Sequence, residues 1–153
     1  MRMQVVRLTN GVTVINDAYN ANPGSTEAAL DAVGRLPGRA IAALGEMREL
    51  GAQSDALHAA VGAHAVAAGV AWVLAVGPGA EPIAAGARRA GAAAVDVCAD
   101  AAAAAGLIAA RWQPGDTVLV KGSRGGDTEP GVRRYGARMA EVVALLEAAA
   151  GAA

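Results

Sequence analysis

The feature that most constrains the fold of this chain is a regular alternation between short apolar runs and longer stretches with helical spacing. Four apolar runs have the length of a buried strand, at Arg39–Gly45, Ala71–Gly77, Ala93–Cys98 and Asp116–Gly122. The stretches 54–69, 82–91, 99–112 and 132–150 are rich in strong helix formers, with apolar residues at helical spacing. This alternation predicts a parallel sheet with helices on both faces.

The N-terminal segment adds an antiparallel element to this sheet. Two short runs, 3–8 and 12–17, flank the turn sequence Thr9-Asn10-Gly11, which predicts a β-hairpin. The predicted fold class is therefore α/β, a three-layer Rossmann-like and mostly parallel sheet with an N-terminal antiparallel hairpin. We find no linker, so residues 1–153 are expected to form a single domain. The alanine-rich tail after Leu146 is expected to be a fraying helix end.

Composition excludes several classes of partner. The chain has 153 residues, is 54% hydrophobic and carries a formal net charge of −1, which is typical of a compact domain and gives no basic footprint for nucleic acid or an anionic membrane. Cys98 is the only cysteine, so no internal disulfide can form.

Residues 56–80 carry no charged side chain except histidine, but this segment is mostly alanine and is too weakly apolar to span a membrane. With no secretory signal visible at the N-terminus, we expect a cytoplasmic location.

Polar side chains gather after the predicted strands, which is where open α/β sheets bind their ligands. The loop after the second run is NDAYNANPGS. In it, Asp17 can accept hydrogen bonds, Tyr19 can stack on a ring, and Asn20 can both donate and accept hydrogen bonds. Asn22-Pro23 in the same loop is typical of a helix start, with asparagine as the N-cap and proline at the first helical position. We therefore assign Asn22 and Pro23 to structure at this stage, and Asp17 and Asn20 to function.

The loop after the last strand is predicted to bind an anion. Lys121 is the only lysine in the chain, and it is followed by Gly122, Ser123 and Arg124. Two cations, a hydroxyl and the backbone N–H groups of a glycine-rich turn can together hold a phosphate or a carboxylate. A solvated basic turn is the alternative interpretation.

Other motifs carry less information. In GEMRELG, the side chains of Glu46 and Glu49 are expected to cap the next helix, and Met47 is expected to pack in the core. His58 and His64 lie six residues apart on a predicted helix, hence on different faces, and we expect surface or packing roles rather than a metal pair. The chain contains no phosphate-binding G-x-x-x-x-G-K-[ST] motif, no G-x-S-x-G and no G-x-G-x-x-G. The sequence therefore does not contain the motifs of a complete enzyme that uses a nucleotide.

Taken together, these motifs resemble those of a known family. DAYNANPGSTEAAL, GEMRELG, the VLAVG strand and VLVKGSR with Glu129 behind it occur in the order and spacing found in the C-terminal domain of the Mur ligases. The resemblance covers nearly the whole chain, and YNANP with VLVKGSR is its most specific part. Two segments depart from the family pattern. GEM lacks an expected aspartate, and GGDTEPG replaces a more apolar approach to Glu129.

The resemblance implies one part of a three-domain enzyme. The other two domains would bind UDP-N-acetylmuramoyl-tripeptide and carry most of the site for ATP and Mg²⁺, while this domain would bring D-alanyl-D-alanine and close over the ATP. Alone, the chain is expected to be inactive. By the same resemblance, the ATP-facing residues are Arg2, Asp17, Tyr19 and Asn20, and the residues near the incoming dipeptide are Asn22, Lys121, Ser123 and Arg124. His58 also matches a family position, with no assigned role.

Two alternatives remain open from the sequence. The chain could be a free-standing module that binds a nucleotide or an anionic metabolite at the strand ends. It could also be a purely structural partner domain.

Overall fold

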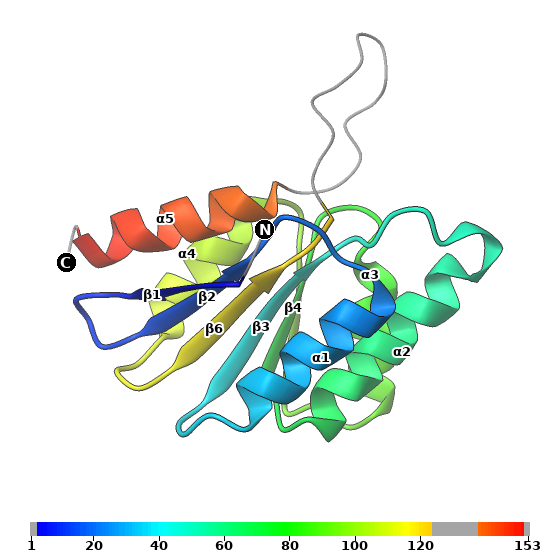
Figure 1. Ribbon diagram of the computed structural model, residues 1–153, viewed down its shortest axis with the longest axis horizontal. Helices are drawn as coiled ribbons and strands as arrows, with labels where there is room; N and C mark the ends of the chain where they lie inside the picture. The colour runs from blue at the N-terminus through cyan, green and yellow to red at the C-terminus, as the bar shows by residue number, and fades with distance from the viewer. Residues whose placement is uncertain (1–2, 124–137, 152–153) are drawn as a thin grey trace, which may run out of the picture.

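The fold is a six-stranded mixed sheet between two layers of helices, as seen in a computed structural model that describes residues 3–123 and 138–151. Figure 1 shows α1, α2 and α3 over one face and α4 and α5 over the other. The strands are β1 (Gln4–Arg7), β2 (Thr13–Asp17), β3 (Ala40–Gly45), β4 (Trp72–Val76), β5 (Ala94–Cys98) and β6 (Thr117–Lys121). The helices are α1 (Pro23–Gly34), α2 (Ser54–Ala67), α3 (Glu81–Arg89), α4 (Ala101–Arg111) and α5 (Met139–Gly151), with a 3₁₀ turn η1 (Gly51–Gln53) before α2.

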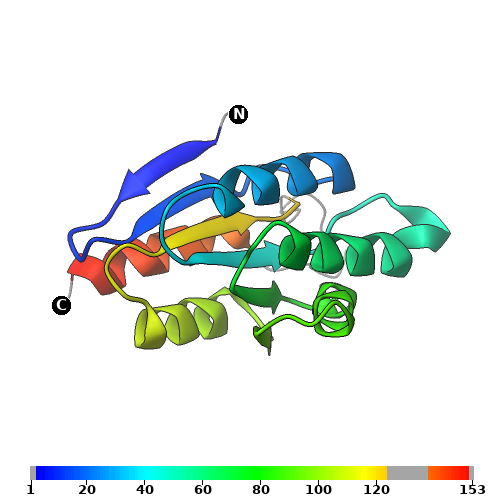
Figure 2. The same ribbon diagram turned by 90° about the horizontal axis from the view of Figure 1, so that it is seen from below.

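The strand order, β1-β2-β6-β3-β4-β5, places the last strand in the middle of the sheet. Only the β1–β2 pair is antiparallel, and Gly11, with φ of 85°, forms its turn. The predicted hairpin, strands and fold class are therefore confirmed. Figure 2 shows α1 and α4 on opposite sides of the strands, which are the two outer layers of the predicted three.

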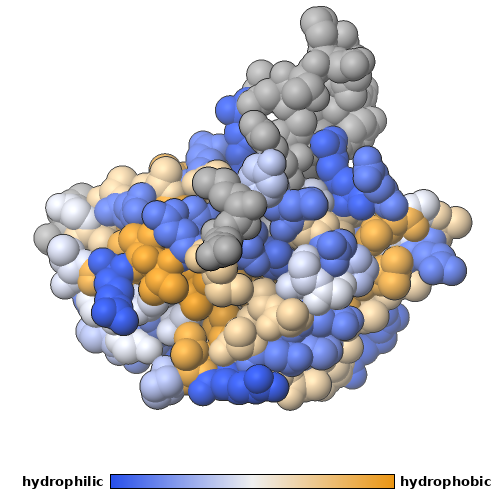
Figure 3. Space-filling model, in the orientation of Figure 1, coloured by the Kyte–Doolittle hydropathy of each residue, from blue (hydrophilic) through white to orange (hydrophobic). Residues whose placement is uncertain are grey.

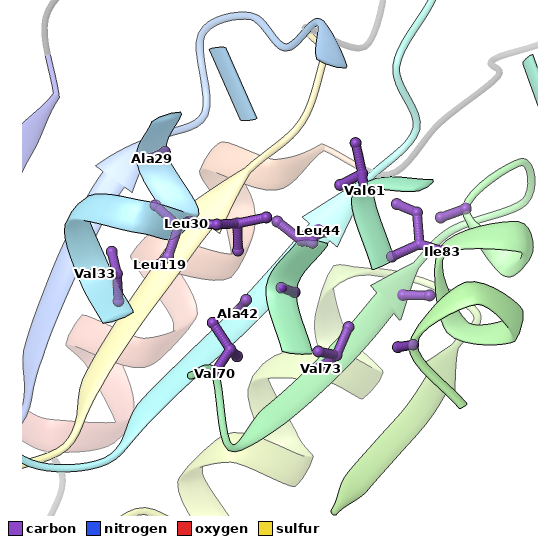
Figure 4. Close-up of a cluster of buried hydrophobic side chains, with 14 of the residues drawn as sticks. Ala29, Leu30, Val33, Ala42, Leu44, Val61, Val70, Val73, Ile83 and Leu119 are labelled. Carbon is purple, nitrogen blue, oxygen red and sulfur yellow. The ribbon is translucent and has the colours of Figure 1, made fainter. Parts of the chain in front are cut away.

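Each sheet face packs its own hydrophobic core. In β3, where all six residues are buried, Ala42 and Leu44 face the α1–α3 layer, while Ile41 and Ala43 face the α4–α5 layer. Figure 4 shows the first of these cores, in which Leu30, Val61 and Ile83 from three helices meet the sheet. This period-two alternation in a strand buried on both sides explains why the apolar runs were continuous in sequence.

The hairpin is less completely covered than the central strands. Val6 packs against the α4–α5 core, whereas Val5 on the other face of β1 is 57% exposed. Figure 3 shows apolar surface in this part of the molecule, over β1 and β2. Within the described residues, no helix combines the length and the apolar character needed to cross a membrane.

The C-terminal tail differs from its prediction. Instead of fraying after Leu146, α5 continues to Gly151, and Ala150 is buried. The Ala150 carbonyl also accepts a hydrogen bond from the Thr9 hydroxyl at 3.4 Å. Packing against the hairpin therefore holds the last turn, which low sequence complexity could not indicate. The predicted start of this helix, 132–137, lies outside the described residues.

Candidate functional site

Three loops meet at the carboxyl edge of the sheet. Because β6 lies between β2 and β3, the loops that follow these three strands are neighbours, although they are far apart in sequence. The first of them leads directly into α1, whose N-terminus therefore lies at this edge. This is the edge at which the sequence predicted a ligand site.

A buried ion pair joins the first of these loops to the last. Lys121 Nζ lies 2.7 Å from Asp17 Oδ2 and 3.1 Å from the Asn20 carbonyl oxygen, and the two side chains are 3% and 17% exposed. Asp17 and Lys121 are opposite each other in the β2–β6 register. The sequence assigned them to different ligands, whereas the structure shows that they bind each other and that Lys121 also donates to the Asn20 carbonyl.

Ser123 connects all three loops. Its hydroxyl donates to the Ala21 carbonyl oxygen at 3.2 Å and accepts from the Arg48 N–H at 3.0 Å. Its own N–H donates to the Glu46 carbonyl oxygen at 3.0 Å. Because a serine hydroxyl has one proton, this proton is used in the present conformation and cannot also be donated to an anion. The structure therefore gives Ser123 the task of holding the loops together, and its predicted contact with a ligand stays a prediction.

A cleft of about 320 Å³ opens above this junction. It is lined by Tyr19, Asn20, Arg48, Glu49 and Ser123. Tyr19 is half exposed, so its ring offers a stacking surface, and Arg48 brings a guanidinium group that suits phosphate or carboxylate. The combination can bind a small molecule that has an anionic group.

Sequence reasoning missed the contribution of GEMRELG to this cleft. Glu46 and Glu49 were expected to cap the next helix, but α2 begins at Ser54 and its N-cap, Gln53, makes no side-chain cap bond. That prediction is wrong, because the chain first turns through η1, and Glu49 takes a left-handed backbone conformation with φ of 63°. Met47 is buried, as expected. The one available signal was the position of the motif directly after a buried strand.

The helix-start assignment of Asn22 is confirmed. Asn22 Oδ1 accepts from the Ser25 N–H at 2.8 Å, and the Ser25 hydroxyl accepts from the Asn22 N–H at 3.2 Å, which together form a capping box. Its proposed contact with the dipeptide is a separate prediction.

We expect Asn22→Ala to lower the free energy of unfolding by about 1 kcal/mol, because α1 loses its side-chain cap. Asn22→Asp keeps a capping oxygen and serves as the matched control, with stability close to that of the unsubstituted chain. Urea denaturation measures both. Equal stability of Asn22→Ala and Asn22→Asp would contradict the capping role.

The remaining predicted residues fall into two groups. Arg2 and Arg124, and also Glu129, lie outside the described residues. The two histidines occupy different faces of α2, as expected: His58 is buried, and the partly exposed His64 places its Nε2 2.8 Å from Asp31 Oδ1 of α1. Across residues 3–123 and 138–151, no three His, Cys, Asp or Glu side chains are grouped so that they could hold a metal ion.

The amino-acid sequence matches the model of a known protein family. Residues 1–124 match the model of the Mur ligase, glutamate ligase domain. The chain therefore belongs to the Mur ligase family.

Its relatives include ligases of one kind. The UDP-N-acetylmuramoyl-tripeptide–D-alanyl-D-alanine ligase of Mycobacterium tuberculosis is 40% identical over 143 residues, which cover 80% of this chain and 28% of the relative. The ligase of the same name from Mycobacterium leprae is 42% identical over 142 residues, covering 80% and 27%. The chain thus spans little more than a quarter of these relatives. They favour the ligase interpretation over a free-standing module.

Solved structures show the same fold. MurF ligase from Thermotoga maritima in complex with ADP matches with a TM-score of 0.73 at 25% identity, covering 97% of this chain and 30% of that one. A domain from a putative ligase of Haemophilus ducreyi, solved by itself, matches with a TM-score of 0.61 at 18% identity over 99% of its length. The second likeness concerns the fold alone.

Proposed function

We propose that this chain is the C-terminal domain of an ATP-dependent ligase that joins D-alanyl-D-alanine to UDP-N-acetylmuramoyl-tripeptide in cytoplasmic peptidoglycan synthesis. The relatives of that name, each about 40% identical to this chain, support the choice of reaction. The other domains of such an enzyme would bind the UDP-linked substrate and most of the ATP. This chain would bind the incoming dipeptide and form one wall of the closed site.

The observation that carries this proposal is the cleft shared by three strand-end loops. A dipeptide has a carboxylate that needs a cation and hydrogen-bond donors, and an amine that must stay exposed for reaction. Arg48 is suited to the carboxylate, and Ser123 and Arg124 are proposed to assist. Lys121 would act from beneath the cleft, because its ammonium group holds Asp17 and the Asn20 carbonyl.

The nucleotide side of the cleft is proposed to be formed by Tyr19 and Asn20, with Arg2. Asp17 would act from beneath it, through its ion pair with Lys121. Tyr19 is exposed enough to stack, and Asn20 lines the same cleft as Arg48. Mg²⁺ is proposed to be held mainly by the other domains of the enzyme, together with the ATP phosphates. ATP would supply the phosphoryl group that activates the tripeptide's terminal carboxylate. The contribution of this chain is to position the attacking amine and to exclude water.

The proposal predicts a local response to the dipeptide. Adding D-alanyl-D-alanine to the isotope-labelled chain should shift the backbone amide signals of Tyr19, Asn20, Arg48 and Ser123 in heteronuclear NMR spectra. The same titration with L-alanyl-L-alanine tests whether these shifts require the D configuration. We expect Arg48→Ala to weaken binding about tenfold, because a hydrogen bond to a charged group contributes about 1.5 kcal/mol.

Arg35→Ala is the control, because it removes the same charge from an exposed arginine at the opposite edge of the sheet. It should leave the affinity unchanged. Shifts confined to another surface, or an equal loss with both variants, would refute the assignment of the cleft. Tight binding of a nucleotide by the chain alone would favour the free-standing module.

A further inference from the structure

His58 is the most completely enclosed polar side chain next to the cleft. It lies on α2, is 0% exposed, and faces the segment between β3 and η1. Its Nε2 is 2.8 Å from the Met47 backbone nitrogen, and its Nδ1 is 2.7 Å from the Ser54 carbonyl oxygen. The family resemblance gave this residue no role, and the proposed function does not use it.

These two partners fix the state of the imidazole. A backbone N–H can only donate, so Nε2 must accept from Met47. A carbonyl can only accept, so Nδ1 must carry the proton and donate to Ser54. The neutral ring with its proton on Nδ1 satisfies both contacts, whereas a protonated ring has no lone pair for the Met47 N–H. The ring therefore links the start of α2 to the loop in one defined orientation.

The next backbone N–H is held by a different residue. The Met47 N–H points to His58, and the following N–H, that of Arg48, points to the Ser123 hydroxyl at 3.0 Å. Glu49 then takes its left-handed conformation, with φ of 63°, alone among the described residues other than glycine. A non-glycine residue in this region is held there by its surroundings, since the conformation is unfavourable by itself.

We infer that His58 is a positioning residue for the cleft: it fixes the Met47 peptide group and thereby sets where Arg48 and Glu49 stand. The effect on binding rests on the proposed function, whereas the effect on loop geometry does not. Any buried imidazole needs hydrogen-bond partners, so it is the choice of partners that matters here. Here both ring nitrogens are used, and one of them holds the residue next to a cleft-lining arginine.

Three variants test this inference. His58→Leu fills a similar volume without an acceptor, and His58→Gln restores an acceptor through its amide oxygen. His64→Gln is the matched control, because this histidine lies on the same helix but is partly exposed and contacts Asp31. NMR of the labelled chain should first show scalar coupling through the hydrogen bond between the Met47 nitrogen and His58 Nε2.

We expect His58→Leu to shift the amide signals of Arg48, Glu49 and Ser123 and to weaken binding of D-alanyl-D-alanine about tenfold, in line with the loss of the Arg48 contact. His58→Gln should recover most of the affinity, and His64→Gln should change neither the signals nor the affinity. If His58→Leu only lowers stability and leaves these signals and the affinity unchanged, the inference is wrong.

Two further outcomes are distinguishable. Absence of the Met47–His58 coupling in the unsubstituted chain would overturn the inference even if His58→Leu failed to fold. If the unsubstituted chain does not bind the dipeptide, the proposed function fails instead. The amide signals of Arg48 and Glu49 in His58→Gln and His58→Leu would then still decide whether His58 positions the loop.

Discussion

Replacing Lys121 with methionine is expected to lower the free energy of unfolding by about 3 kcal/mol, because it leaves the carboxylate of Asp17 without its buried partner. Lys121 is 3% exposed, and its ammonium group also holds the Asn20 carbonyl, so the variant releases the first loop of the cleft as well. Methionine has a similar volume, so cavity formation adds little. Urea denaturation followed by the fluorescence of Trp72 and Trp112, of which Trp72 is buried, measures the change.

The double variant Asp17→Leu/Lys121→Met separates the ion pair from general packing. It removes both charges together, and we expect it to recover most of the stability lost in the single variant, because a hydrophobic replacement of a buried pair is often neutral. A loss of less than about 1 kcal/mol in Lys121→Met would be typical of a solvated pair. That result would support a lysine available to a ligand, as the sequence suggested.

The distinction matters for the site. In the sequence, Asp17 and Lys121 lie at the ends of two strands and were assigned to different ligands. In the structure, these strands are neighbours, and the two side chains neutralise each other at 2.7 Å. Arg48 thereby becomes the cleft-lining cation among the described residues, and the pair beneath it becomes the support for the loop.

The sheet could be predicted because its signal is local. β3 is buried on both faces, so the run AIAALG is continuously apolar and is recognisable without any knowledge of its neighbours. The same applies to the helix start at Asn22-Pro23, where the cap is made within one turn. The edge of the sheet that carries the polar loops followed from the direction of parallel strands.

The contacts of Ser123 could not be predicted, because they depend on the strand order. Nothing local in the sequence indicates that β6 inserts between β2 and β3, and only that order brings Ser123 to Ala21 and Arg48. The left-handed turn at Glu49 is equally hidden, since glutamate rarely adopts it. The neighbouring backbone N–H groups of Met47 and Arg48 are held by His58 and Ser123, which are distant from this turn in sequence.

The contact between α2 and α3 gives the second large prediction. These helices approach so closely that a Cβ atom added at Gly86 would lie 1.9 Å from the Ala59 carbonyl oxygen, and one at Gly62 would lie 2.0 Å from the Ile83 carbonyl oxygen. Both obstacles are backbone atoms, which cannot move without separating the helices. We therefore expect Gly86→Ala to lower the free energy of unfolding by about 3 kcal/mol through overpacking.

Gly106→Ala is the matched substitution, because Gly106 also lies inside a helix, α4, but is exposed and has open space around its Cβ position. There the helix propensity of alanine dominates, and we expect the free energy of unfolding to rise by about 0.5–1 kcal/mol. The same substitution is thus expected to change the free energy of unfolding in opposite directions at these two helical glycines. Urea denaturation of both variants gives the comparison directly. Stabilisation by Gly86→Ala would mean that α2 and α3 do not touch through their backbones, and the core between them would then need another explanation.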